Sequence, residues 1–121
     1  MYENEIKWIE YKTKKILNVN YRNRKDKEMI EILRTAVDII RAAPDKPLVL
    51  ADFEEWEGNL EYLDEAKKLG REVMNERVLK MAVTGIDGLK KIFFNSYITN
   101  AKAKNTKAFK TRQDALEWLV E

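Results

Sequence analysis

The spacing of hydrophobic residues along the chain switches between the two-residue period of strands and the longer period of helices. Two short runs at the start are rich in β-branched and aromatic residues, and the second alternates cleanly, which predicts a β-hairpin. Five strands are expected in all, at residues 6–11, 16–21, 48–51, 78–83 and 106–109. Four helices are expected between and after them, starting near residues 29, 59, 87 and 111.

The order of these elements is β-β-α-β-α-β-α-β-α. Strands that alternate with helices are joined most economically by right-handed crossovers into a largely parallel sheet. The run at 48–51 has no polar position, which indicates a central strand that is covered on both faces. We therefore predict a single α/β domain over residues 1–121, with a mostly parallel sheet, an antiparallel opening strand and covering helices.

The amino-acid composition excludes several kinds of catalytic and metal site. The chain has 121 residues, a length that fits one domain, and it contains no Cys, no His and a single Ser. Disulfides, thiolate catalysis, Cys-ligated metals and an imidazole base are therefore excluded. The remaining residues offer no recognisable set of nucleophile, base and orienting group, so we expect a non-enzymatic protein without catalytic residues, cofactor or metal.

Hydropathy bears on the location of the protein. No hydrophobic run approaches the roughly 20 residues that are needed to cross a bilayer. Residues 1–10 are polar and acidic, whereas a secretory signal is basic and then apolar. We expect a cytoplasmic protein without a membrane span.

Charge is nearly balanced, with 23 Lys and Arg against 21 Asp and Glu, but it is unevenly placed. Residues 51–76 contain nine acidic and three basic residues, whereas residues 88–113 contain seven basic residues and no acid. The five cations at 101–112, with Phe109 nearby, could contact a nucleic acid. The net charge of only +2 and the lack of a nucleic-acid motif disfavour that partner.

The loop after the central strand crowds carboxylates and large aromatic residues together. Ligands of open α/β sheets tend to bind beyond the carboxyl ends of the strands, where this loop lies. We predict a partner-binding site here, with Phe53 and Trp56 as exposed apolar anchors and the glutamates as an acidic rim. Acid–base chemistry, cation binding and simple stabilisation of the next helix are the alternatives. The predicted site consists of Asp52, Phe53, Glu54, Glu55, Trp56 and Glu57.

The connection after the fourth strand combines glycines with basic residues. Thr84, Gly85 and Gly88 lie between a strand and a helix, where backbone N–H groups can bind an anion. Lys90 and Lys91 follow closely. Neither a P-loop nor a G-x-G-x-x-G dinucleotide motif is present. The simpler explanation is that the glycines ease a tight turn and close packing of the helix, and both explanations stay open.

The helix near residue 89 carries large apolar residues on more than one side. Phe94 and Ile98, four residues apart, are expected on its outward side. An exposed strip of this kind can form a dimer or partner surface, or line a pocket for an apolar ligand. Helical spacing predicts an inward face of Leu89, Ile92, Phe93, Ser96 and Tyr97.

Four segments together resemble a known family of domains. They are residues 15–21, 48–52, 83–95 and 109–119, of which the last two are the most specific. Their pattern resembles the SpoIIAA-like group of STAS-type domains, which are also described as STAS/SEC14-related proteins. The resemblance implies a small regulatory or binding module without established catalysis, and it makes a lipid-like ligand conceivable.

The sequence departs from this family at one important position. The best understood relatives are anti-sigma-factor antagonists, in which phosphorylation of a Ser after the central strand switches protein binding. Asp52 matches the acid before that Ser, but residues 53–58 contain neither Ser nor Thr, so we expect no phospho-switch. Glu54 could instead place a permanent negative charge near the start of the next helix.

These observations favour a regulatory module that acts by binding another protein, with a second copy of the chain as one candidate partner. The alternative is a carrier or sensor of a small apolar, lipid-like ligand. Its pocket would lie between the sheet and the helix at residues 89–99.

Overall fold

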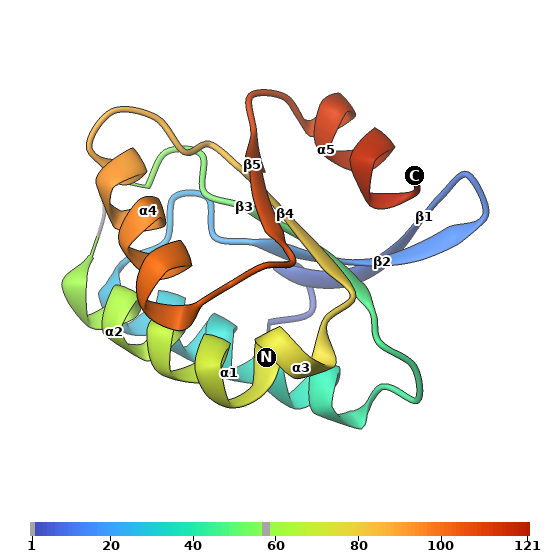
Figure 1. The fold of residues 1–121 in the computed structure, drawn as a ribbon, viewed down its shortest axis with the longest axis horizontal. Coiled ribbons are helices and arrows are strands. Elements are labelled where there is room, and N and C mark those ends of the chain that lie inside the picture. Colours follow the sequence, from blue (N-terminus) through green and yellow to red (C-terminus); the bar gives the residue numbers. More distant parts are fainter. Residues whose placement is uncertain (1, 57–58) are drawn as a thin grey trace.

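The computed structural model describes residues 2–56 and 59–121, which form one sheet with helices on both sides (Figure 1). The strands are β1 (Ile6–Tyr11), β2 (Lys14–Asn20), β3 (Leu48–Asp52), β4 (Lys80–Thr84) and β5 (Thr106–Phe109). The α-helices are α1 (Asp26–Ala42), α2 (Leu60–Leu69), α3 (Asn75–Arg77), α4 (Lys90–Ala101) and α5 (Arg112–Leu119). A π-helical segment, η1 (Gly70–Met74), joins α2 to α3.

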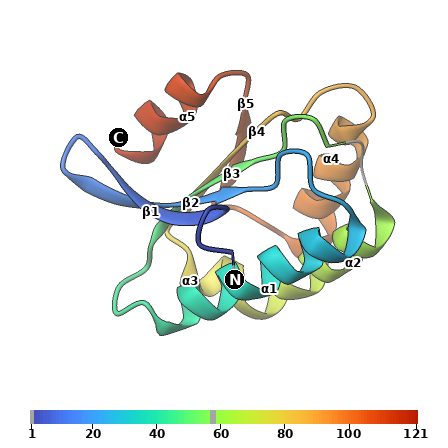
Figure 2. The same ribbon diagram turned by 180° about the vertical axis from the view of Figure 1, so that it is seen from behind.

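The strands lie in the sheet in chain order, β1-β2-β3-β4-β5. β1 is antiparallel to β2, and all later neighbours pair in parallel. Each crossover from β2 onward leads to the next strand along the sheet in the same direction, so right-handed connections place α1, α2 and α4 on one face. Figures 1 and 2 show these helices on one side of the sheet and α5 on the other. The predicted α/β class with an antiparallel opening strand is therefore confirmed.

The sheet separates two hydrophobic cores. Successive strand residues point to opposite faces, so Val49 belongs to the core under α1, α2 and α4, whereas Leu50 belongs to the core under α5. The larger core holds most of the aromatic residues. The buried residues of the smaller core are Ile16, Leu48, Leu50, Ala82, Ala115, Leu116 and Leu119.

Local signals explain several helix boundaries. The side chain of Asn59 accepts a hydrogen bond from the Tyr62 N–H at 2.8 Å, and this contact caps the start of α2. Thr111 caps α5 in the same way, through the Asp114 N–H at 3.1 Å. Gly70 does not end the second helix, because its backbone stays right-handed and the helical path continues through η1 into α3. None of the helices in residues 2–56 and 59–121 is long and apolar enough to cross a membrane.

Candidate functional site

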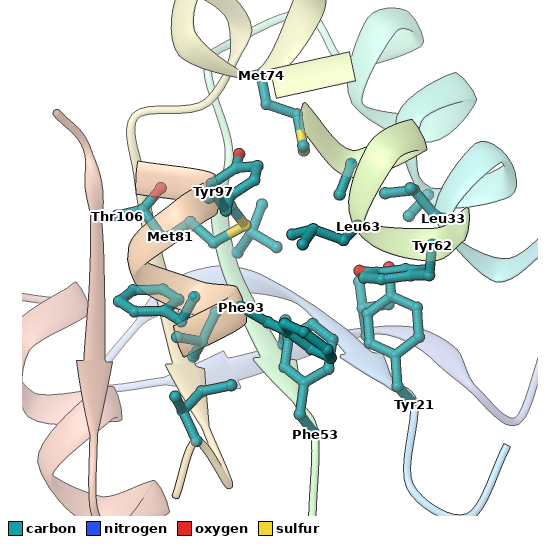
Figure 3. A pocket seen from close by; sticks show the side chains of 18 of the residues that line it. Tyr21, Leu33, Phe53, Tyr62, Leu63, Met74, Met81, Phe93, Tyr97 and Thr106 are labelled. Carbon is teal, nitrogen blue, oxygen red and sulfur yellow. The ribbon is translucent and has the colours of Figure 1, made fainter. Parts of the chain in front are cut away.

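An apolar cavity of about 70 Å³ lies between the sheet and helices α1, α2 and α4 (Figure 3). Side chains from strands β2 to β5 line one side, and side chains from the three helices line the other. Within the described part of the chain, no charged side chain lines it. Its polar side-chain groups are the indole N–H of Trp56 and the hydroxyls of Tyr21, Tyr62, Tyr97 and Thr106. Such a lining suits an uncharged apolar molecule with few polar groups.

Small residues at facing positions create this space. Ala51 lies on β3 in the middle of the sheet, Ala36 lies on α1 and Ala66 lies on α2, and all three line the cavity. The two methionines, Met74 and Met81, also line it. Methionine side chains are flexible and adapt to irregular gaps, so this wall can change shape around a guest.

An aromatic cluster closes the cavity near the carboxyl ends of β2 and β3. Tyr21 follows β2 and stacks on Phe53, which follows β3, with ring centroids 4.8 Å apart. Tyr62 of α2 meets both rings edge-on, at 5.2 and 5.9 Å. Trp56 packs against Phe53 at 5.1 Å and reaches Phe93 of α4 at 6.3 Å. The loop that contains Phe53 and Trp56 is thereby fixed to the wall of the cavity.

This cluster corrects the expected role of Phe53 and Trp56. We predicted exposed anchors, but the two side chains are only 7% and 8% exposed and belong to the larger core. The Phe53 N–H bonds to the Thr84 carbonyl at 2.9 Å, which extends the β3–β4 pairing by one residue. Glu55 then adopts a left-handed backbone with φ of 63°, and the Trp56 N–H bonds to the Phe53 carbonyl, so the chain turns back toward the core.

The carboxylates of the same loop lie apart from the cavity. Asp52 accepts a hydrogen bond from the Glu54 N–H at 2.8 Å, which shapes the turn. Glu55 is exposed and lies 3.9 Å from Arg22. Glu57 lies outside the described residues. Across residues 2–56 and 59–121, no group of three or more Asp or Glu residues is placed to hold a metal ion.

The predicted anion loop packs against this acidic loop. Gly85 has φ of 79°, and a Cβ atom at this position would lie 2.4 Å from the Glu54 backbone nitrogen, so only glycine fits. The buried Lys90 ammonium donates to the Phe53 carbonyl at 3.2 Å and lies 3.4 Å from the Asp87 carboxylate. Lys91 is exposed. These contacts support the structural explanation for Gly85 and Lys90, and anion binding here stays a prediction.

Gly88 and Thr84 complete that loop without adding an obvious ligand group. Gly88 also has a left-handed backbone, with φ of 53°, but a Cβ atom there would meet open space. The carbonyl of Gly88 accepts the Lys91 N–H, one of three turn-type hydrogen bonds at the start of α4. Thr84 is 5% exposed at the end of β4. Because backbone N–H groups at this helix start already have partners, fewer of them are available to an anion.

The orientation of α4 also differs from the prediction. Phe94 and Ile98, expected outside, pack against the larger core, and Phe94 lines the cavity. Leu89 and Ile92, expected inside, are 61% and 62% exposed. The helix carries apolar residues around much of its circumference, so spacing alone does not select one face. In the observed orientation, the Lys90 ammonium also reaches the Phe53 carbonyl of the acidic loop.

The buried tyrosines are the main feature that the sequence does not single out. Tyr21 and Tyr62 share a side-chain hydrogen bond, and burial raises the pKa of both hydroxyls. Burial also raises the pKa of Tyr97. All three hydroxyls therefore stay protonated at physiological pH. A tyrosine at an apolar position of a strand or helix is the only sequence signal, and ordinary core packing explains that equally well.

Comparisons with known proteins bear on the fold. No family model matches the chain, and no curated protein matches it either. The structure is similar to the crystal structure of an uncharacterised DUF3478-family protein with a SpoIIAA-like fold from Shewanella loihica PV-4. The two chains are 20% identical, with a TM-score of 0.59 over 94% of this chain and 91% of the other. The resemblance expected from the sequence is thus confirmed at the level of architecture: this chain has a SpoIIAA-like fold.

Proposed function

We propose that this protein is a non-enzymatic binding module that holds a small, uncharged apolar molecule between the sheet and helices α1, α2 and α4. The observation that carries the proposal is the cavity, because its lining is apolar apart from a few hydroxyls and the Trp56 indole. An unpaired charge would be costly in such a lining, whereas an apolar guest gains burial.

The size of the cavity limits the guest. A space of about 70 Å³ is larger than the roughly 10–15 Å³ that a single water molecule needs. It is smaller than an engineered cavity of about 150 Å³ that binds benzene. A guest of several heavy atoms therefore requires some side chains to move. Met74 and Met81 are suited to that adjustment because of their flexible, unbranched side chains.

Benzene is a suitable probe for this proposal. When benzene is titrated into protein with 13C-labelled methyl groups, the methyl NMR resonances of lining residues such as Val49 and Leu63 should shift. Leu50 and Leu116 in the core under α5 act as internal controls and should not shift. If saturating benzene leaves the lining methyl groups unchanged, the proposed function is wrong.

A pair of matched variants tests the location. Ala51→Val adds two methyl groups on the cavity side of β3 and should weaken benzene binding at least tenfold, because the added volume fills the space. Ala82→Val makes the same change on β4, on the face toward α5, and should leave binding unchanged in folded protein. Equal binding by Ala51→Val and the original protein would place benzene elsewhere.

A second function, recognition of a protein partner, is favoured by exposed apolar side chains at the carboxyl end of the sheet. Leu60 begins α2 and is 66% exposed, and Leu89 and Ile92 are similarly exposed at the start of α4. The acidic Glu54 and Glu55 precede α2 in the chain. Side chains of this kind form the apolar centre and charged rim of protein interfaces.

The partner-binding function can be tested by capture from the native host. The double variant Leu89→Ser/Ile92→Ser should lose a partner that the original protein retains. Leu79→Ser is the matched control, because Leu79 is also exposed but precedes β4, at the opposite end of that strand. Equal loss with both variants, or no loss with the double variant, would contradict this surface.

A further inference from the structure

The hydroxyl of Tyr97 is a buried polar group without a hydrogen-bond partner among the described residues. Tyr97 lies on α4, is 7% exposed and lines the cavity. In Figure 3 its hydroxyl lies toward the end of the cavity near Met74, away from the hydroxyls of Tyr21 and Tyr62. Those two tyrosines share a hydrogen bond, so Tyr97 is the lining tyrosine whose hydroxyl has no partner among the described residues.

The ring of Tyr97 is held in place by its neighbours. A Cβ atom at Gly70 would lie 2.8 Å from the Tyr97 oxygen and 3.0 Å from its Cε1 atom, so the hydroxyl rests directly over the glycine. The same Cβ atom would lie 3.1 Å from Ala101. Close contact between α4 and the start of η1 therefore positions the hydroxyl before any guest arrives.

An unpartnered buried hydroxyl is unusual, because a polar group that loses water without gaining another hydrogen bond destabilises the fold. A phenylalanine would supply the same ring without that cost. Burial raises the pKa of the hydroxyl, so the group is a donor at physiological pH. Such a donor, among described lining residues that carry no charged side chain, matches an uncharged acceptor on a guest.

We infer that the guest of this cavity is a small apolar molecule with one uncharged acceptor oxygen, such as a ketone, and that the Tyr97 hydroxyl donates a hydrogen bond to this oxygen. The inference rests on the proposed apolar-ligand function and adds the chemical class of the ligand. Free fatty acids do not fit, because their carboxylate would lie unpaired in the cavity.

Cyclopentanone and cyclopentane are suitable probes, since they share a small ring and differ by the carbonyl oxygen. Tyr97→Phe should weaken cyclopentanone binding about tenfold, the effect of losing one hydrogen bond, and should leave cyclopentane binding equal or tighter. The 13C resonance of the bound carbonyl should lie downfield in the original protein relative to Tyr97→Phe. Tyr62→Phe is the control, because it removes one hydroxyl of the hydrogen-bonded pair Tyr21 and Tyr62. It should not weaken cyclopentanone binding relative to cyclopentane binding.

The outcomes separate this inference from the proposed function. If both probes bind and Tyr97→Phe changes neither their affinities nor the carbonyl resonance, the inference is wrong while the cavity function stands. That result would mean that the hydroxyl finds another partner, such as a water shared with the unpartnered side-chain oxygen of Asn75. If Tyr62→Phe weakens cyclopentanone binding and Tyr97→Phe does not, the inference is wrong, because the donor to the carbonyl oxygen is then the Tyr21 and Tyr62 pair. If neither probe perturbs the lining methyl groups of the original protein, both proposals fail.

Discussion

The two faces of the sheet are packed in different ways. Under α5, large aliphatic side chains such as Leu50 and Leu119 are fully buried. Under α1, α2 and α4, the same strands present Ala51 and Val49 to alanines and aromatic rings, and a cavity remains. Fully buried aliphatic side chains such as Ile32 occur on that face too, so the two faces differ in the cavity and in its lining of alanines and aromatic rings. Alternation along a strand makes this possible, because neighbouring residues point to opposite faces.

The largest expected effect comes from removing volume on the α5 face. Leu50→Ala should lower the free energy of unfolding by about 3–5 kcal/mol, because it opens a cavity at a fully buried position. Leu63→Ala on the other face should cost about 2 kcal/mol, since Leu63 already borders empty space. Urea unfolding measures both values. Equal losses would show that the two faces are packed alike.

Adding volume should again destabilise the α5 face more than the cavity face. Ala82 is fully buried under α5, so Ala82→Val should destabilise the fold by about 1–3 kcal/mol through overpacking. Ala51→Val extends into the cavity and should change stability by less than about 0.5 kcal/mol, because space and the β-branched shape favour it there. Urea unfolding measures both changes, and the midpoints are compared where the dependence of the free energy of unfolding on urea concentration is the same. A cost for Ala51→Val as large as that of Ala82→Val would argue that the cavity is not available to protein atoms.

The contact between Gly70 and Tyr97 is a smaller, local test of the cavity face. Gly70→Ala should destabilise the protein by about 1 kcal/mol, because the clash of its Cβ with the ring is partly offset by the better helix propensity of alanine. Tyr97→Phe in that background should restore part of the loss, since it removes the oxygen 2.8 Å from the Cβ position. Thermal unfolding of both single variants and the double variant gives the coupling. Purely additive effects would contradict the contact.

The sheet was more predictable than the site, for physical reasons. The positions of the strands and the helix caps follow from local alternation and from side chains such as Asn59 and Thr111, which act on residues close in sequence. The burial of Trp56 depends on a left-handed backbone at Glu55 and on contacts with three rings, two of which come from α2 and α4. The local spacing of residues predicts neither. The cavity is a long-range result as well, because its alanines come from separate elements.

The smallest expected effect concerns an exposed cluster that joins the β1–β2 hairpin to α5. Glu117 accepts hydrogen bonds from Tyr11 at 2.6 Å and from Lys12 at 2.7 Å. Chiefly because of the bond from Lys12, the pKa of Glu117 lies below its ordinary value of 4.5. A carboxyl with a lowered folded-state pKa stabilises the fold above its unfolded value and loses that contribution as pH falls through the folded value.

Glu117→Gln should therefore lower the urea midpoint slightly at pH 7, and the difference from the original protein should shrink as pH falls from about 5 toward 3. The effect is small because solvent and salt screen an exposed pair, and added salt should reduce it further at pH 7. Glu10→Gln, a change in an exposed carboxylate of β1, is the matched control and should not lower the urea midpoint comparably at pH 7. A difference that grows on acidification would mean that the cluster does not favour the ionised carboxylate. Because this contact lies on the α5 side, benzene binding in the cavity should be the same in Glu117→Gln, which separates the stability of one face from the function proposed for the other.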